Sequence, residues 1–273
     1  MKKNIIFIGL LVFISAVAII KAFQGKEKEF VIVIPSYNNK EWYKKNIDSV
    51  LQQNYHNYSV VYADDCSLDG TGDLVEEYAQ EAIKTGKLKL IKNQQRKLSL
   101  ENIYTVLHTL SPQVIVVLVD GDDWLAHNDV LSHLNAVYQN NDVWLTYGQY
   151  QMCPGTGIGI CRSIPHRVIE NNQFRNYQWV TTHLKTFYAG LFHKIKKQDL
   201  QYKDTFFAMT GDQAFMFPML EMAGSHIQFI SEVLYTYNTV NPINDWRVDA
   251  ALQHSIERYI RGSERYAPLK KLF

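Results

Sequence analysis

The most constraining feature of this chain is an apolar run that ends abruptly in carboxylates. Residues 114–119 read Val-Ile-Val-Val-Leu-Val, and Asp120, Asp122 and Asp123 follow at once. An apolar run bounded by charge is typical of a strand buried on both faces of a parallel sheet. Such sheets bind ligands at the carboxyl ends of their strands. Three adjacent carboxylates repel one another, which indicates a divalent cation, although a solvated Asp-Gly turn explains this single stretch equally well.

Strand-like and helix-like segments alternate along the chain. Apolar runs predict strands over residues 30–34, 58–63, 88–91, 114–119, 143–147 and 233–237. Helical spacing of apolar residues predicts helices over residues 41–53, 69–84, 98–110, 129–139 and 212–222. We expect residues 148–165 to form a loop and residues 178–196 to be partly helical. This order predicts an α/β fold with a mostly parallel sheet that is flanked by helices.

Composition narrows the class of protein. The 273 residues are 47% hydrophobic and 20% charged, which is enough apolar material for one sizeable core. The formal net charge is +1, so we expect no nucleic acid partner. The three cysteines do not form a disulfide framework, and no Cys/His spacing indicates zinc.

The N-terminus predicts a membrane anchor. A low-polarity run extends from Ile5 to Ile20, with lysines on both sides. A cleaved signal peptide is the alternative, because Ala16-Val17-Ala18 resembles a cleavage site. The apolar run continues past that site, so we expect a single-pass anchor that is retained. We place the anchor and the start of a linker in residues 1–25 and one domain in residues 26–273. The flanking lysines leave the side of the membrane undetermined.

Polar motifs follow three of the expected strands. Residues 35–39 (Pro-Ser-Tyr-Asn-Asn) come after the first strand, and residues 64–71 (Asp-Asp-Cys-Ser-Leu-Asp-Gly-Thr) after the second. Parallel strands bring these motifs to the same sheet edge as residues 120–123. Farther along, Asp212 opens an expected helix, where an N-cap is the simplest explanation for it alone.

Together these motifs resemble family 2 glycosyltransferases of the GT-A fold, which is Rossmann-like. The resemblance rests on Val-Ile-Pro-Ser-Tyr-Asn, the motif at residues 64–71, Val-Asp-Gly-Asp-Asp and Gly211-Asp212-Gln213-Ala214-Phe215, in that order. It covers about residues 30–238. It implies a nucleotide-sugar-dependent enzyme that transfers one sugar to an acceptor hydroxyl with inversion. Residues 26–273 would then be the catalytic domain.

The resemblance also implies roles for individual residues. Asp65 or its neighbour Asp64 would hold the nucleotide base, and Pro35 and Tyr37 would shape the nucleotide pocket. In the acidic turn, the implied roles are ribose or metal contact for Asp120, principal metal ligand for Asp122 and sugar-donor contact for Asp123. Asp212 would be the general base.

These roles are chemically coherent. Mn²⁺ or Mg²⁺ would neutralise charge on the departing diphosphate, while Asp212 takes the proton of the attacking hydroxyl. We expect a nucleotide-sugar donor, with a UDP-sugar first, and a glycan, lipid or protein acceptor. The membrane would be a further partner through the N-terminal segment.

The chain also departs from the family pattern. Gly211 stands where the family often has Glu, and the late His that can touch the metal is missing after Tyr237. Asn241, Asn244 and Asp245 lie near enough in sequence to replace it. The Gln-x-x-Arg-Trp signature of processive synthases is absent, which favours single addition.

Two alternative functions stay open. A non-catalytic nucleotide-sugar or carbohydrate-binding module would explain the missing Glu and His. A nucleotidyltransferase would also present acids on such a sheet, but it usually has a Gly-rich basic loop after the first strand. Several further residues have no assigned role: for Arg96, Lys97 and Lys185 a solvated surface charge competes with phosphate contact. His183 could reach the site, but we expect a structural hydrogen-bonded role for it. Trp124 and Trp179 could stack on a sugar, but we expect them to pack in the core.

Overall fold

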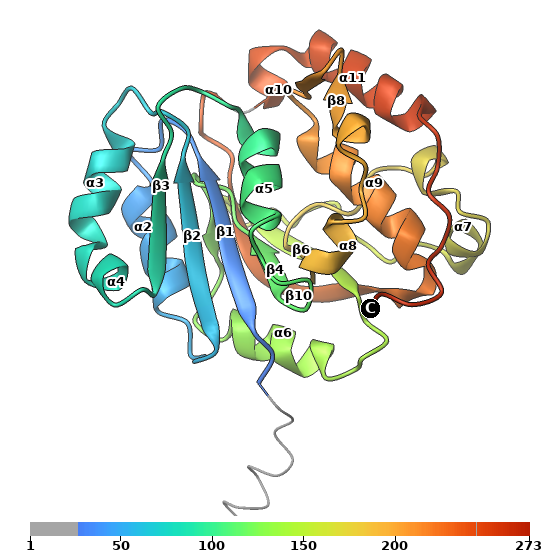
Figure 1. Ribbon diagram of the computed structural model, residues 1–273, viewed down its shortest axis with the longest axis horizontal. Coiled ribbons are helices and arrows are strands. Elements are labelled where there is room, and N and C mark those ends of the chain that lie inside the picture. Colours follow the sequence, from blue (N-terminus) through green and yellow to red (C-terminus); the bar gives the residue numbers. More distant parts are fainter. Residues whose placement is uncertain (1–26, 244) are drawn as a thin grey trace, which may run out of the picture.

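A computed structural model describes residues 27–243 and 245–273. Its main feature is an eight-stranded sheet in the order β3-β2-β1-β4-β7-β6-β10-β5, with helices on both sides (Figure 1). The predicted class, a mostly parallel sheet flanked by helices, is confirmed. The expected anchor at residues 1–25 lies outside the described residues. Within the described ranges, no helix has the length and apolarity to cross a membrane.

The first half of the chain forms the parallel part of the sheet. β1 (Phe30–Ser36) pairs in parallel with β2 (Tyr58–Asp64) on one side and with β4 (Ile115–Leu118) on the other. β3 (Leu88–Lys92) extends this part beyond β2. In this register Ser36 lies opposite Asp64, and Val33 lies opposite Leu118. The polar motifs after β1, β2 and β4 therefore leave the sheet at the same edge, as the sequence predicts.

The second half completes the sheet with mixed strand directions. β7 (Lys185–Tyr188) runs antiparallel between β4 and β6 (Leu145–Cys153). β10 (Ile227–Asn238) is parallel to β6, and the short β5 (Trp124–Leu125) pairs antiparallel with β10. A separate small ribbon consists of β8 (Gln201–Tyr202) and β9 (Thr205–Phe206).

One prediction for this half was wrong, and another was confirmed only in part. Residues 148–153, expected in a loop, continue strand β6, because pairing with the long β10 carries this polar stretch to Cys153. Residues 178–196, expected to be partly helical, contain β7 and only the one-turn helix α8 (Ala189–Phe192). Insertion of β7 between two strands decides its conformation, and local sequence does not show that pairing.

Helices cover both faces of the sheet. The longer ones are α2 (Tyr43–Leu51), α3 (Thr71–Tyr78), α5 (Ser99–Leu107), α6 (Val130–Tyr138), α9 (Gly211–Ala223) and α11 (Ala250–Gly262). The shorter ones are α4 (Gln80–Lys84), α7 (His166–Glu170) and α10 (Asp245–Val248), with 3-10 turns at Phe174–Asn176, Lys197–Leu200 and Gly224–His226. The predicted helix over residues 69–84 is interrupted at the buried Ala79. Helix α9 ends at Gly224, as predicted.

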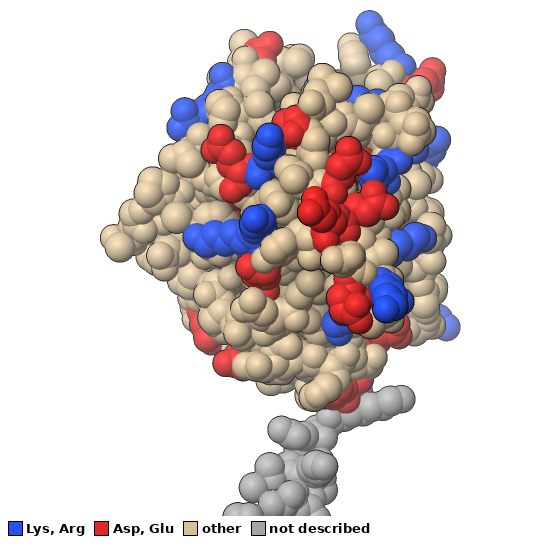
Figure 2. Space-filling view, turned by 90° about the vertical axis from the view of Figure 1, so that its left-hand side faces the viewer, with Lys and Arg blue, Asp and Glu red and all other residues tan. Residues whose placement is uncertain are grey.

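The face over α3, α4 and β3 carries both signs of charge side by side (Figure 2). Lys92, at the end of β3, lies between Asp73 and Glu76 of α3, at 2.6 and 2.8 Å. Such exposed pairs contribute little to stability. This face therefore carries exposed ion pairs of mixed charge, as protein surfaces commonly do.

Candidate functional site

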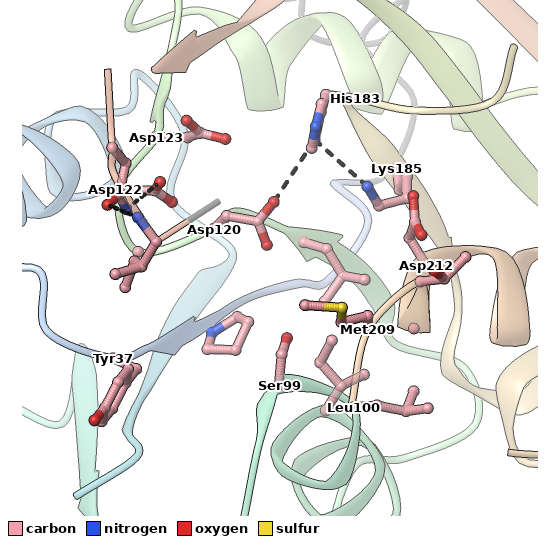
Figure 3. A pocket seen from close by; sticks show the side chains of 18 of the residues that line it. Tyr37, Ser99, Leu100, Asp120, Asp122, Asp123, His183, Lys185, Met209 and Asp212 are labelled. Atoms are coloured by element: carbon pink, nitrogen blue, oxygen red, sulfur yellow. Dashed lines mark hydrogen bonds and ion pairs between the residues drawn. The ribbon is translucent and has the colours of Figure 1, made fainter. Parts of the chain in front are cut away.

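A cavity of about 330 Å³ opens at the sheet edge where β1 and β4 end. The N-terminal turn of α9 forms its opposite wall (Figure 3). Six of the predicted site residues line it: Pro35, Tyr37, Asp120, Asp122, Asp123 and Asp212. The structure thus brings residues that follow β1 and β4 together with Asp212 of α9, which is remote in sequence, around one cavity.

The acidic turn after β4 is held by its neighbours. The Asn46 side-chain amide, on α2, donates to the backbone oxygens of Asp120 and Asp123 at 2.9 and 2.8 Å. Gly121 packs so closely that an added Cβ would come within 2.5 Å of Asn39 Nδ2 and 2.6 Å of Ser36 Oγ. Only glycine fits here, so the turn is fixed against the end of β1.

Asp123 joins this turn to β10. Its carboxylate accepts a 2.7 Å bond from the Tyr235 hydroxyl and another of 2.7 Å from the backbone N–H of Asn238. Burial raises the pKa of Asp123 well above its ordinary value, and the neighbouring Asp122 and Asp120 raise it further. The side chain is buried, so its contact with a sugar donor stays a prediction.

Asp122 is hydrogen-bonded to Asn241, one of the three residues considered as a replacement for the missing late His. The Asn241 side-chain amide donates to Asp122 Oδ2 at 2.7 Å. Burial raises the pKa of Asp122 to about 6, and the charge on Asp120 adds to the rise. This carboxylate therefore gains from a nearby cation. Of the other two candidates, Asn244 lies outside the described residues, and the structure describes only the backbone of Asp245.

Asp120 is the most open of the three acids and faces His183. Asp120 Oδ2 lies 3.8 Å from His183 Nδ1, and the imidazole stacks on the Tyr235 ring with centroids 4.5 Å apart. Burial lowers the pKa of His183 well below its ordinary value, and the Lys185 charge lowers it further. The preferred expectation was a structural His183, and the structure places the residue in the cavity wall, the position that the alternative allowed.

A divalent cation fits these residues. One ligand atom each from Asp120, Asp123 and His183 falls within a span of 4.8 Å. Carboxylate oxygens and a neutral imidazole nitrogen are suitable ligands for Mn²⁺, and Mg²⁺ accepts the carboxylates together with water. The predicted ligand Asp122 is adjacent in the same turn, with its carboxylate bonded to Asn241.

Asp64 and Asp65 lie outside the cavity lining. Asp65 accepts bonds from the backbone N–H groups of Lys97 and Leu98, both at 2.8 Å, and from Asn93 Nδ2 at 2.9 Å. It therefore anchors the segment that leads into α5. Asp64 Oδ2 accepts from the Ser67 N–H at 3.2 Å, while its buried Oδ1 has no hydrogen-bond partner.

Arg96 stacks on Tyr37, one of the aromatic residues that line the cavity. The Arg96 guanidinium lies 3.9 Å from the centroid of the Tyr37 ring. Lys97, the other basic candidate here, contributes its backbone N–H to Asp65. The two tryptophans pack as expected in sequence: Trp124 is buried, with Lys45 Nζ 3.6 Å above its ring, and Trp179 contacts Phe217.

Asp212 occupies the first turn of α9 on the far wall. The N-cap position belongs to Thr210, and Asp212 Oδ1 accepts the Gln213 N–H at 2.8 Å. Burial raises the pKa of Asp212, and the positive charge of Lys185 opposes that rise. The carboxylate combines a helix-terminal bond with a place in the cavity wall.

His183 and Lys185 both line the cavity, a position that their sequence context did not establish. Lys185 is buried at the start of β7, and its ammonium lies 3.4 Å from His183 Nδ1. His183 lies just before β7, and its place beside Lys185 depends on the insertion of β7 between β4 and β6, which local sequence does not show.

Comparison with known proteins agrees with this geometry. The sequence profile described as Glycosyl transferase family 2 matches residues 31–215. The UDP-Glc:alpha-D-GlcNAc-diphosphoundecaprenol beta-1,3-glucosyltransferase WfgD of Escherichia coli is 28% identical over 145 residues, which cover 53% of this chain and 54% of that protein. An uncharacterized glycosyltransferase of Haemophilus influenzae is 27% identical over 53% of this chain and 58% of its own. The match thus spans little more than half the length of these relatives.

Solved structures share the fold. TarS of S. aureus (residues 1–349, with UDP-GlcNAc) superposes with a TM-score of 0.64 and 18% identity, covering 85% of this chain and 65% of that one. The mannosyltransferase PcManGT of Pyrobaculum calidifontis, with GDP-Man and Mn2+, gives a TM-score of 0.56 and 20% identity over 90% and 67%. The profile match extends over more than half of the sequence, and on that basis the chain belongs to glycosyl transferase family 2.

Proposed function

We propose that this protein transfers one sugar from a nucleoside diphosphate sugar to an acceptor hydroxyl, with a divalent cation and with inversion. The observation that carries this proposal is the two-sided cavity. The acidic turn after β4 forms one wall, and Asp212 of α9 forms the opposite wall. Inverting transfer needs a cationic leaving-group site and a base on opposite sides of the reacting carbon.

A UDP-sugar is the donor that we propose. The relative WfgD is named for UDP-Glc, and TarS was solved with UDP-GlcNAc and with UDP. In this chain Pro35 and Tyr37 line the cavity, and Arg96 stacks on Tyr37. A planar base has an aromatic and cationic surface available there. Asp65, which is buried outside the cavity lining, would support the base pocket by ordering the segment that leads into α5.

Asp120 and Asp122 would hold the cation, with Asp123 and His183 beside them. When bound, a divalent cation neutralises the charge that develops on the leaving diphosphate. The supporting observations are the raised pKa of Asp122, the close approach of the ligand atoms of Asp120 and His183, and the Mn2+ complex of the neighbour PcManGT. Removal of a cation would leave the carboxylates of this turn facing one another.

Asp212 would act as general base. The acceptor oxygen attacks the anomeric carbon while the bond from that carbon to the phosphate oxygen breaks. The acceptor's proton passes to the Asp212 carboxylate, and the electron pair leaves with the nucleoside diphosphate. The partly buried position of Asp212 in the cavity wall supports this role, because desolvation raises the pKa of the carboxylate and with it the basicity.

For the acceptor we propose a hydroxyl of a glycan that is carried on a lipid. WfgD is named for an acceptor linked to diphosphoundecaprenol, and the N-terminal residues of this chain predict a membrane anchor. An anchored domain would meet such an acceptor at the membrane surface. Protein and free glycan acceptors are the alternatives that the assay includes.

The test is a panel of nucleotide sugars with Mn²⁺, in which the full chain is assayed for transfer to lipid-linked, free and protein-borne glycans. We expect turnover with a UDP-sugar, lost in chelator and in Asp122→Ala. Tight nucleotide-sugar binding with no transfer to any acceptor would instead support a non-catalytic binding module. Release of pyrophosphate from a nucleoside triphosphate would support a nucleotidyltransferase. The motif after β1 argues against that last activity, because residues 35–40 lack glycine.

A further inference from the structure

The ionisable side chains around the cavity are mostly acidic. Four carboxylates line it, from Asp120, Asp122, Asp123 and Asp212. Among the described residues that line it, Lys185 is the one lysine or arginine. A carboxyl group in such a place tends to become neutral, because burial and like charge both disfavour the ionised form. A neutral Asp212 could not accept a proton.

Lys185 is placed to offset this imbalance. It begins strand β7 opposite Leu118 of β4, two residues before the acidic turn, and its side chain is 5% exposed. Figure 3 shows it between His183 and Asp212. Its ammonium donates to His183 Nδ1 at 3.4 Å, and no carboxylate of the described residues lies within 4.0 Å of it. A buried ammonium with so few direct partners acts on its surroundings mainly through its charge.

We propose that Lys185 is a positioning residue for Asp212: its buried ammonium is the counter-charge that keeps the Asp212 carboxylate ionised in the shared cavity wall. This inference rests on the proposed function, in which Asp212 is the base. The absence of direct contact is part of the role. A hydrogen bond from Lys185 would occupy an oxygen that Asp212 needs for the acceptor's proton, whereas attraction across the cavity leaves that oxygen free.

The other charged groups that face Asp212 act in the opposite direction. Lys185 on β7 lowers the pKa of Asp212, while Asp120 after β4 and Glu257 on α11 raise it. The backbone N–H of Gln213 also favours the ionised form. Two variants therefore predict shifts of opposite sign. Removing the Lys185 charge raises the pKa of Asp212, and removing the Glu257 charge lowers it.

The experiment follows the Asp212 carboxyl directly, by NMR of the full chain with carbon-13 at aspartate Cγ. The Asp212 resonance is the one that disappears in Asp212→Asn. For Lys185→Met we expect its titration midpoint to rise by about one to two pH units. Lys185→Arg should leave it nearly unchanged, and Glu257→Gln should lower it. Lys194→Met, an exposed lysine outside the cavity lining, is the matched control.

The same variants are then compared in the pH dependence of kcat/KM. The acid limb should move with the NMR midpoint, with the rate recovering at high pH in Lys185→Met. A midpoint that is unmoved in Lys185→Met would overturn the inference, even if activity falls. The NMR readout needs no turnover, so a chain without transferase activity would contradict the proposed function and still decide the role of Lys185.

Discussion

The Asn241 side-chain amide donates a 2.7 Å hydrogen bond to Asp122 across the mouth of the cavity. Asn241 follows β10, whereas Asp122 follows β4, so the bond joins two segments that are remote in sequence. The bond stabilises the ionised carboxylate, whose pKa burial raises to about 6. Asn241, one of the three residues considered as a replacement for the missing late His, thus orients a predicted metal ligand.

Replacing Asn241 with Ala should weaken metal binding without removing a carboxylate. Partners that orient a metal ligand typically contribute about 10-fold to 100-fold in affinity. We expect Mn²⁺ affinity, measured by electron paramagnetic resonance, to fall within that range. Asn141→Ala, whose side chain bonds the exposed Lys28, is the control. Equal Mn²⁺ affinity in both variants would show that Asn241 does not orient a ligand.

Asp122→Asn should stabilise the metal-free protein at neutral pH. A folded-state pKa near 6 exceeds the ordinary value of 3.8, so ionised Asp122 opposes folding above pH 6. The penalty is up to about 3 kcal/mol for a shift of this size, and it disappears as the pH falls and both states become protonated. The difference in Tm between variant and wild type should therefore be positive at pH 7.5 and close to zero near pH 4. A difference that does not vary with pH contradicts the raised pKa.

Gly121→Ala should destabilise the acidic turn. The new methyl would lie 2.5 to 2.7 Å from atoms of Asn39 and Ser36, so the turn or the end of β1 must shift. We expect a loss of about 1–3 kcal/mol in urea unfolding, as for other overpacked sites. Gly262→Ala, where an added Cβ meets nothing within 4 Å, should cause no such loss. Equal stability of the two variants would show that Asn39 and Ser36 move aside for the added methyl at little cost.

The buried ion pair between Arg175 and Glu221 predicts strong coupling. Arg175 Nε and Nη2 donate to the two Glu221 oxygens at 2.6 and 3.0 Å, and Nη1 donates to the Ile260 oxygen at the end of α11. Arg175→Met leaves a buried carboxylate unpaired, with an expected cost of about 3–5 kcal/mol. Arg175→Met combined with Glu221→Leu should recover much of that loss in urea unfolding. No recovery in the double variant would show that the remaining hydrogen bonds dominate.

The sequence predicted the part of the site that follows strands β1, β2 and β4, because local patterns define these strands. β1, β2 and β4 are apolar runs with sharp polar ends, so their convergence follows from parallel pairing alone. For His183 and Lys185 the sequence left a site role open without establishing it, because β7 is short and includes polar residues that only its neighbours bury. Asn46 had no local signal either: its bonds to the acidic turn depend on how α2 packs. Contacts between segments that are remote in sequence determine the positions of these three residues, so local patterns could not predict them.

Asp212 is the residue on which the proposed sugar transfer most depends, because it would act as the base. The most direct measurement compares UDP-sugar binding and sugar transfer in wild type and Asp212→Asn, at saturating Mn²⁺. Loss of a general base alone costs about 10²-fold to 10⁴-fold in kcat. We expect kcat to fall by that factor in Asp212→Asn, with the dissociation constant of the sugar donor nearly unchanged. Transfer at the wild-type rate in Asp212→Asn would contradict it.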